Sequence, residues 1–327
     1  MKKITVIGGG TGTFVVLSGL KNYGLDLGVI VSMMDSGGST GRLRDQLGVL
    51  PPGDLRQALL ALSDAPILWR RLFLYRFQNG DLDGHNFGNL FLSALEKVSK
   101  NYEEVIKSAS YVLKTKGTVI PVTFEKTHLA VEYQSGEIVK REGNIDTNYN
   151  EKSRIKREYL EPQVKANPQA VSRVLESDYI IIGPGDLYTS IVPTLLVDGM
   201  KEALIKTKAK LIYILNLMTK SGQTTNYKAT DHLKDISSYF GKIPHFVIVN
   251  NGQIPKDIIE WYKREDEHVV QNDLDSSNYK GKVIVNDVVD RNKFDKSEGD
   301  KFVDPLVRSI LRHNSKKLAG VLVKIIT

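Results

Sequence analysis

The sequence predicts an α/β protein: a Rossmann-like, doubly wound, mainly parallel sheet that carries a small antiparallel β insertion. Short apolar runs without polar alternation recur along the chain, and glycine turns and helical segments follow them, which is typical of parallel strands covered on both faces. One central stretch instead alternates polar and apolar residues, as antiparallel strands with one solvated face do. With 327 residues, the chain is long enough to form such a core and an insertion.

The first part of the chain is expected to supply two strands and four helices of this core. A strand at residues 4–7 passes directly into glycines and a helix that Gly24 ends, and a second strand is expected at residues 27–34. The other helices are expected at residues 52–63, 67–77 and 87–100.

The alternating stretch sets the predicted domain boundaries. Residues 111–165 are expected to form the β-rich insertion, because the alternation runs to residue 143 and a charged segment follows it that is either an exposed loop or the rim of the same meander. Residues 1–110 and 166–327 then form one nucleotide-binding core. Its second part is expected to contain strands at residues 179–182, 210–217 and 245–250 and helices at residues 171–176, 195–207, 230–240, 255–264 and 305–313.

The composition excludes several classes of protein. The apolar and charged fractions, 41% and 25%, are those of an ordinary globular protein and not of a disordered or collagen-like chain. Cysteine is absent, which excludes disulfides, thiolate metal sites and cysteine nucleophiles. No apolar run approaches the roughly 18 residues of a membrane span, and the N-terminal apolar stretch is too short for a signal peptide. We therefore expect a cytoplasmic protein without a membrane span.

The positive charge favours a small phosphorylated ligand. The net charge of +7 arises from 45 basic and 38 acidic residues, and the basic residues are spread along the chain. A protein that binds nucleic acid normally concentrates its basic residues in one footprint, so we expect no nucleic-acid partner. A few arginines that face phosphate groups explain the charge better.

The segment GGGTGT lies between the first strand and the first helix. At such a turn, glycines allow the backbone to approach a phosphate, and the helix N-terminus offers free N–H groups and the positive end of its dipole. The match to the dinucleotide fingerprint is imperfect, because Thr13 stands where that fingerprint has a glycine, and the P-loop ending is missing. The candidate phosphate contacts here are Gly9, Gly10, Thr11, Gly12 and Thr13.

The segment DSGGSTGRLR follows the second strand and is expected to form a loop. Its glycines and hydroxyls suit an anion cradle, and its arginine side chains suit phosphate oxygens. A nicotinamide-binding domain would have an ordinary helix connection here, so the loop argues for a ligand with more than one phosphate. Asp35 has three open roles: metal ligand, acceptor for a sugar hydroxyl, or cap of the loop. The candidate contacts are Asp35, Ser36, Gly37, Gly38, Ser39, Thr40, Arg42 and Arg44.

Two helix starts carry further candidates. PPGDLRQ places Asp54 and Arg56 in the first turn of a helix, where Asp54 is either a dipole partner or a carboxylate of a catalytic site. Arg56 then points either into the site or into an ion pair. GHNFGN places His85, Asn86 and Asn89 at the start of another helix. His85 is a general base, a donor to phosphate or a structural hydrogen-bonding group.

The second half repeats the pattern of strand, glycine turn and helix in GPGDLYTS and ends a later strand with LNLMT. Tyr188 offers a ring for base stacking or a hydroxyl for a phosphate, and the alternative is packing in the core. Asn216 stands at the carboxyl end of a strand, where its amide is well placed to read a base or a ribose. The candidate contacts here are Gly183, Gly185, Asp186, Tyr188, Thr189, Asn216 and Thr219.

These segments, in this order, resemble the CofD/YvcK-like family, which contains 2-phospho-L-lactate transferases and gluconeogenesis factors. The motifs GGGTGT, DSGGSTGRLRDQLGVLPPGDLRQ, GHNFGNL, GPGDLYTSIVPTLL, LNLMT and TDHL carry the resemblance, which lies closer to the YvcK branch. It implies a cytoplasmic Rossmann-like protein that binds UDP-type nucleotide sugars, such as UDP-N-acetylglucosamine, with a role linked to carbon metabolism, cell-wall synthesis and cell shape. Asp186 departs from the family pattern, which has a serine there. A carboxylate would repel a phosphate unless a cation bridges them or it faces outward.

The leading hypothesis is a regulatory protein that binds a nucleotide sugar without turnover. The diphosphate is expected across residues 9–13 and 36–44, with base and ribose contacts from Asn216 and the turn at residues 183–189. Positioning groups and charge are sufficient for such a protein, and a homo-oligomer is compatible with the sequence.

The alternative is a 2-phospho-L-lactate transferase-like phosphotransferase that acts on a deazaflavin-type acceptor. That chemistry requires orientation and charge stabilisation, with Mg²⁺ bridging phosphates. Asp35, Asp54 and Asp186 are the carboxylates suited to the ion, with Asp35 and Asp186 as the metal-ligand candidates, and His85 would be the base. Apart from Mg²⁺, the sequence implies no cofactor.

Overall fold

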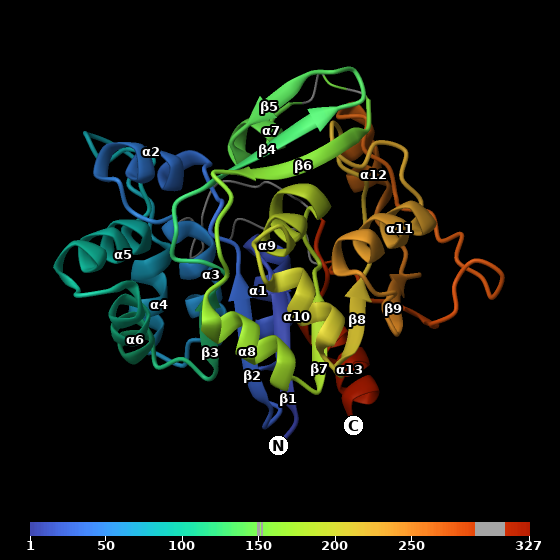
Figure 1. Cartoon of the computed structure of the whole chain (residues 1–327), viewed down its shortest axis with the longest axis horizontal. Coiled ribbons are helices and arrows are strands. Elements are labelled where there is room, and N and C mark those ends of the chain that lie inside the picture. Colours follow the sequence, from blue (N-terminus) through green and yellow to red (C-terminus); the bar gives the residue numbers. More distant parts are fainter. Residues whose placement is uncertain (149–150, 152, 292–310) are drawn as a thin grey trace.

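The computed structural model describes residues 1–148, 151, 153–291 and 311–327 (Figure 1). Within these residues, seven strands form a sheet in the order β10-β9-β8-β7-β1-β2-β3, and every neighbouring pair is parallel. Another three strands of the described chain form a separate antiparallel sheet in the order β5-β4-β6. This arrangement confirms the predicted fold class.

The order of the large sheet reverses beside β1. The chain builds β1, β2 and β3 outward to one edge, returns to pair β7 with β1, and then adds β8, β9 and β10 toward the other edge. In open α/β sheets of this kind, ligands bind at the carboxyl ends of the strands where the order reverses. The strands of the large sheet are β1 (Lys3–Gly8), β2 (Asp26–Val31), β3 (Thr118–Pro121), β7 (Tyr179–Ile182), β8 (Lys210–Ile214), β9 (Phe246–Asn250) and β10 (Lys282–Asn286).

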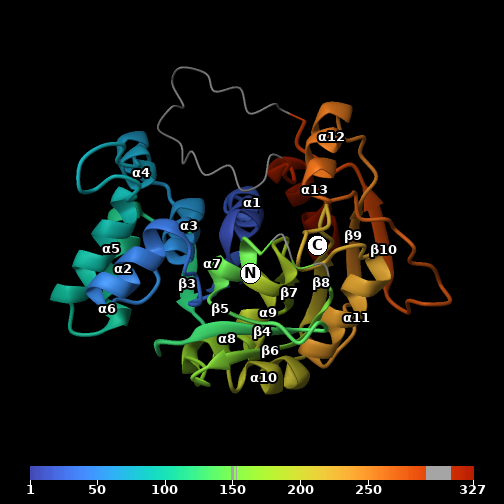
Figure 2. The same ribbon diagram turned by 90° about the horizontal axis from the view of Figure 1, so that it is seen from above.

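Helices cover both faces of this sheet, as Figure 2 shows. One face carries α1 (Gly10–Leu20), α3 (Pro52–Leu62) and α13 (Ser315–Ile326). The other face carries α8 (Pro168–Glu176), α10 (Met200–Lys206) and α11 (Ala229–Phe240). The remaining elements are α2 (Gly38–Leu47), α4 (Ile67–Leu74), α5 (Phe87–Val98), α6 (Tyr102–Leu113), α7 (Glu142–Asp146), the π-helical turn η1 (Leu187–Ile191), α9 (Val192–Leu195) and α12 (Lys256–Arg264).

Local sequence explains why these elements begin where they do. All four residues of β7, the run YIII, are buried between the two helical layers. Helix α3 starts with Pro52, whose missing N–H costs nothing in the first turn. Helix α5 starts after Asn86, whose side chain accepts a hydrogen bond from the backbone N–H of Asn89. In the described residues, no helix has the length and apolar character needed to cross a bilayer.

Most predicted strands and helices are present, with boundaries that differ by a few residues. The main difference in the first half is the segment DSGGSTGRLR, which was expected to be a loop. It becomes helix α2 from Gly38 onward, because Leu43 and Arg44 find buried positions on one face of that helix. Helices α6 and α13 were not expected. Of the helix expected at residues 305–313, residues 305–310 lie outside the described part, and His313 forms an isolated bridge with Val289 instead.

The insertion differs from the prediction at its first end. Residues 111–113 complete α6, and β3 pairs with β2 in the large sheet, so the small sheet begins only after Pro121. Of the two alternatives for the segment after residue 143, an exposed loop or the rim of the meander, the structure has the rim: β6 (Ile155–Glu161) is an edge strand that pairs with β4 (His128–Tyr133). The third strand is β5 (Ile138–Lys140). Figure 1 shows this small sheet above the carboxyl ends of the parallel strands.

The small sheet packs on the core through a buried acidic contact. Glu158 of β6 is only 6% exposed, and its carboxyl lies beside Asp235 and Tyr239 of α11. Burial raises the pKa of Glu158 well above its usual range, and the charge of Asp235 raises it further. Nearby, Arg154 pairs with Asp231 at 3.1 Å and adds an exposed ion pair to the same contact.

We expect the Glu158→Gln variant to gain stability relative to the wild type as the pH rises. A carboxyl whose pKa is higher in the folded state binds a proton on folding, so its contribution is complete below the unfolded pKa near 4.5 and is lost as the pH rises toward the folded pKa. Glutamine cannot ionise, so the difference should grow toward about 1.4 kcal/mol per unit of pKa shift.

Urea unfolding of both proteins between acidic and mildly alkaline pH measures this difference. Glu161→Gln is the matched control, because Glu161 is exposed at the end of the same strand. Stability curves of wild type and Glu158→Gln that run parallel across the pH range would contradict the prediction.

Candidate functional site

A cavity of about 350 Å³ opens at the carboxyl edge of the large sheet, where β1 and β7 lie side by side. Its walls come from the segments that follow β1, β2, β7 and β8 and from the first turns of α3 and α5. Among the residues that the sequence indicated, those lining it are Gly9, Gly10, Thr11, Gly12, Asp35, Gly37, Gly38, Ser39, Thr40, Asp54, Arg56, Asn89, Gly185, Asp186, Thr189, Asn216 and Thr219.

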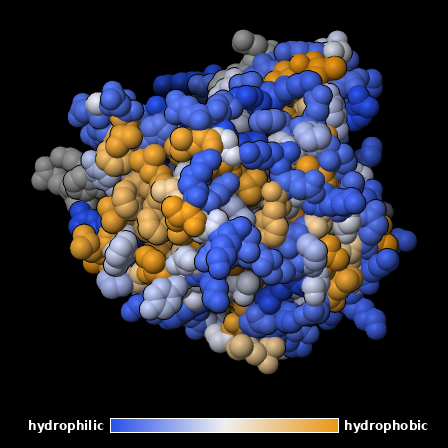
Figure 3. All heavy atoms as spheres, turned by 60° about the vertical axis from the view of Figure 1, so that its left-hand side comes forward, coloured by the Kyte–Doolittle hydropathy of each residue, from blue (hydrophilic) through white to orange (hydrophobic). Residues whose placement is uncertain are grey.

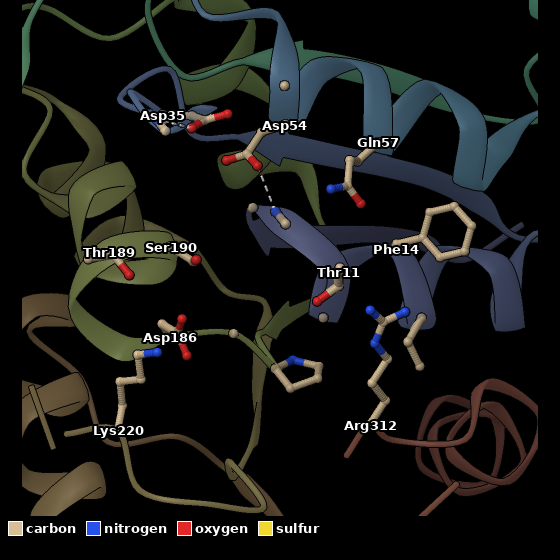
Figure 4. A pocket seen from close by; sticks show the side chains of 18 of the residues that line it. Thr11, Phe14, Asp35, Asp54, Gln57, Asp186, Thr189, Ser190, Lys220 and Arg312 are labelled. Carbon is tan, nitrogen blue, oxygen red and sulfur yellow. Dashed lines mark hydrogen bonds between the residues drawn. The ribbon is translucent and has the colours of Figure 1, made fainter. Parts of the chain in front are cut away.

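The glycine loop lies between two close neighbours. The backbone N–H of Gly10 donates to Asp54 Oδ1 at 2.8 Å (Figure 4). A Cβ at Gly9 would collide with the Asp54 carboxylate, and a Cβ at Gly12 would collide with the backbone carbonyl of Pro184. The loop therefore requires glycine at position 12, where the obstacle is backbone, whereas a side chain at position 9 would displace the Asp54 carboxylate; one N–H at the start of α1 already has an anionic partner.

The start of α2 forms the next wall. The backbone N–H of Gly37 donates to Asp35 Oδ1 at 3.0 Å, so Asp35 closes the turn that leads into the helix. Asn89 Nδ2 lies 3.4 Å from the hydroxyls of both Ser39 and Thr40 and connects α2 with α5. These contacts hold the two hydroxyls at the cavity wall.

His85 lies behind this wall and does not line the cavity. Its Nδ1 is 3.1 Å from Ser39 Oγ, and the side chain is buried. Burial lowers the pKa of His85, and the charges of Arg42 and Arg76 lower it further, so a neutral imidazole is favoured. The geometry gives His85 a supporting contact with Ser39 and no direct access to the cavity as a base.

Both arginines of the second motif point away from the cavity. Arg44 is 9% exposed, and its guanidinium donates to the carbonyls of Met34, Asp35 and Thr127. Arg42 donates to the carbonyl of Asp83 at 2.7 Å. Arg44 therefore ties the second strand end to the insertion.

Five further predicted residues also stand outside the lining. Thr13 donates its hydroxyl to the Gly9 carbonyl, Ser36 accepts from the backbone of Gly143, and Asn86 caps α5. Tyr188 is buried, and its hydroxyl contacts Asp235 and the hydroxyl of Tyr227. Gly183 adopts a left-handed backbone with φ of 72° at the turn after β7. These five residues therefore support the cavity walls without lining the cavity.

Polar and charged side chains from several elements lie around the glycine loop. Figure 4 shows Asp186, Thr189 and Lys220 to the left of Thr11, and Phe14 and Arg312 to its right. The lining also has acceptors that lack a partner in the described chain: the side-chain oxygens of Asn89 and Asn216 are buried without a hydrogen bond. The amide nitrogen of Asn216 donates to the Gly185 carbonyl at 2.8 Å, which fixes its orientation.

Acidic and basic side chains both line the cavity, and the sequence indicated only some of these residues. Lys220 Nζ lies 3.7 Å from Glu267 Oε1 and 4.0 Å from Asp146 Oδ1. Burial raises the pKa of Glu267, and Lys220 opposes this shift. Lys220 directly follows the motif LNLMT and could have been inferred from its position, whereas no motif marks the others. The charged lining residues that the sequence did not indicate are Arg76, Glu142, Lys220, Glu267 and Arg312.

The described side chains do not by themselves form a metal centre. No group of three or more His, Asp or Glu residues within that part of the chain is arranged to hold an ion. Mg²⁺ usually binds through one or two carboxylates together with substrate phosphates. Asp35 and Asp186, the two metal-ligand candidates, both line the cavity.

Comparison with known proteins agrees with this architecture. Residues 4–289 match the family model described as 2-phospho-L-lactate transferase CofD. The chain is 38% identical over 327 residues to the gluconeogenesis factor of Bacillus subtilis, covering 99% of this chain and 98% of the relative. It is 43% identical over 262 residues to the gluconeogenesis factor of Listeria innocua, covering 79% and 80%. A crystal structure of a UPF0052 family protein from Bacillus halodurans superposes with a TM-score of 0.88 at 35% identity, covering 99% of this chain and 100% of that one.

We expect Arg44→Ala to destabilise the protein without any ligand, by about 2–3 kcal/mol, because three backbone carbonyls lose buried donors. Arg42→Ala is the matched control, because that side chain is exposed and donates to a single carbonyl, and its cost should stay below about 1 kcal/mol. Chemical denaturation of the unliganded variants measures both values. An Arg44→Ala protein as stable as the wild type would contradict the assigned contacts.

Proposed function

The chain belongs to the CofD family, and from this premise we propose that its cavity binds a nucleotide sugar of the UDP type as a regulatory ligand. The observation that carries the proposal is the convergence of four strand ends and the N-termini of α1 and α2 on one cavity. Backbone N–H groups at helix starts favour phosphate oxygens, and the reversal of strand order is where such folds bind nucleotides.

The polar lining supports recognition of a base and a sugar beside the phosphates. Asn89 and Asn216 both line the cavity, and their buried side-chain oxygens, which have no hydrogen-bond partner in the described chain, would gain from an N–H or O–H group of a ligand once a side-chain rotation exposes them. Ser39, Thr40 and Thr189 add hydroxyls to the same cavity. We assign the diphosphate to the starts of α1 and α2 and the base or ribose to the side of Asn216.

A regulatory role agrees better with the position of His85 than transfer chemistry does. The sequence offered His85 as the base of a transferase, and that side chain lies behind Ser39 instead of at the cavity. The relatives named gluconeogenesis factor support a role linked to carbon metabolism. We extend the proposal to cell-wall synthesis and cell shape, both of which depend on activated sugars.

Phospho-group transfer is the second candidate, and the lining carboxylates favour it. Asp35, Asp54 and Asp186 face the same cavity, where Mg²⁺ held jointly with ligand phosphates would balance their charge. The description of the matched family as 2-phospho-L-lactate transferase supports the same chemistry.

We expect UDP-N-acetylglucosamine or UDP-glucose to raise the melting temperature of the protein, corresponding to about 2.7 kcal/mol at 100 times the dissociation constant. Thr11→Val should weaken this binding about tenfold, because it removes a hydroxyl at the start of α1 while keeping the shape of the side chain. Differential scanning fluorimetry and calorimetry with UDP-sugars, GDP and inorganic phosphate, each with and without Mg²⁺, measure the effect.

The unliganded melting temperature of Thr11→Val serves as the control and should equal that of the wild type. Stabilisation by inorganic phosphate as strong as that by the UDP-sugar would contradict nucleotide-sugar recognition. Consumption of a phospholactyl donor in the presence of Mg²⁺ and a deazaflavin-type acceptor would instead establish the transferase.

We expect Asp54→Asn to bind the UDP-sugar about fivefold more tightly than the wild type in the absence of Mg²⁺. Asparagine keeps an oxygen that accepts from the Gly10 N–H but removes the negative charge that opposes a phosphate at the start of α1. Calorimetric titration without divalent ions measures the change. Weaker binding by Asp54→Asn under these conditions would show that the Asp54 carboxylate contacts the ligand favourably.

A further inference from the structure

Exposed apolar side chains gather at the outer end of the helical layer, away from the cavity described above. Ile67, Leu68 and Trp69 open α4 and are 68%, 74% and 41% exposed, and Tyr111 of α6 is 84% exposed. Figure 3 shows apolar residues gathered on the side of the molecule that carries α4 to α6. Isolated apolar residues are normal on a surface, whereas a contiguous group marks an interaction site. We call Ile67, Leu68, Trp69 and Tyr111 the α4–α6 patch.

Packing of α4 in the core does not explain these residues. Phe73 is the residue of α4 that packs in the core. It is buried, and its ring contacts the rings of Phe87 and Phe91 on α5. Ile67, Leu68 and Trp69 form the exposed first turn of α4, after Pro66, and Tyr111 lies in the last turn of α6. Helix α4 is therefore apolar toward the core and again toward the outside.

Basic residues surround the α4–α6 patch. Lys107 and Lys114 line a shallow groove between Trp69 and Tyr111. Three more basic residues lie next to this groove: Lys21, Arg70 and Lys116. Burial lowers the pKa of Lys21, and the nearby charges of Arg70 and Lys116 lower it further. Asp64 offsets one of these charges through an ion pair with Lys116 at 3.1 Å. Two acidic residues, Glu103 and Glu104, stand in the first turn of α6, away from Tyr111 in its last turn.

We propose that the α4–α6 patch docks on an anionic lipid bilayer. Ile67 and Leu68 offer two largely exposed aliphatic side chains to the acyl boundary, and Trp69 and Tyr111 have the amphipathic rings that prefer the interface. The surrounding lysines and arginines match the negative surface potential of such a membrane. In a symmetric dimer formed through this patch, the basic residues around it would face the same basic residues of the second copy, and this repulsion favours a bilayer over a second copy of the chain.

The same short helix connects the patch with the cavity. Leu74 at the end of α4 and Arg76 just beyond it line the cavity, whereas Ile67, Leu68 and Trp69 at its start belong to the patch. Docking would therefore hold one wall of the cavity at the membrane surface. The proposal does not depend on which ligand the cavity binds.

Co-sedimentation of the full chain with phosphatidylserine-containing vesicles tests the proposal, with pure phosphatidylcholine vesicles as the comparison. We expect binding to the anionic vesicles that weakens with salt, and at least a tenfold loss in the double variant Ile67→Asp/Leu68→Asp. Ile243→Asp is the matched control, because Ile243 is an exposed aliphatic residue elsewhere on the protein and should bind like the wild type. Unchanged melting temperatures would confirm that both variants are folded.

Tryptophan fluorescence gives a second, local measurement. The chain contains two tryptophans, so Trp261→Phe leaves Trp69 as the sole reporter. We expect its emission to shift to shorter wavelengths when anionic vesicles are added. Wild-type protein that ignores anionic vesicles, or a double variant that binds them equally well, would overturn the proposal. Self-association that is lost in Ile67→Asp/Leu68→Asp would assign the patch to a second copy instead and would also overturn it.

Discussion

The close approach of the loop after β1 to the turn after β7, and to the Asp54 carboxylate of α3, is the constraint on which the site depends. The loop after β1 lies between Asp54 of α3 on one side and the turn after β7 on the other, and neither Gly9 nor Gly12 has room for a Cβ. This packing fixes the start of α1 against both neighbours. Because β2 and β8 flank β1 and β7 in the sheet, their carboxyl ends are brought to the same cavity. The glycines therefore serve the fold first, and their value for binding follows from it.

The fold could be predicted from the sequence because its signals are local and repeated. Buried parallel strands are apolar without interruption, and β7 is the clearest case. The errors occur where tertiary contacts decide. Residues Gly38–Leu47 have the glycines and hydroxyls of a loop, yet they form α2 because buried positions are available for Leu43 and Arg44. Strand β6 could not be told from an exposed loop because it is highly charged, and its buried Glu158 carries no sign of burial in the sequence.

The candidate site was predicted only in part, again because local motifs are visible in the sequence and tertiary contacts are not. Motifs at strand ends indicate which backbone segments meet, and Gly9, Asp35, Asp186 and Asn216 indeed reach one cavity. Motifs do not indicate side-chain direction. Arg44 has a guanidinium that suits a phosphate, but this group donates to backbone carbonyls instead. The hydroxyl of Tyr188 likewise contacts Asp235. Arg312 and Glu267 come from segments without a motif, and only the three-dimensional fold brings them to the lining.

The charges of the lining constrain the ligand more than any single contact does. Within the described lining, five carboxylates (Asp35, Asp54, Glu142, Asp186 and Glu267) face four cationic side chains (Arg56, Arg76, Lys220 and Arg312). A cavity so nearly balanced has little net attraction for a bare polyanion, and the carboxylates would oppose it. Hydroxyl groups and base edges, in contrast, can donate to carboxylate and amide oxygens while phosphates meet the cations and helix N-termini. The lining therefore agrees with the proposal of a ligand that carries hydrogen-bond donors beside its phosphates.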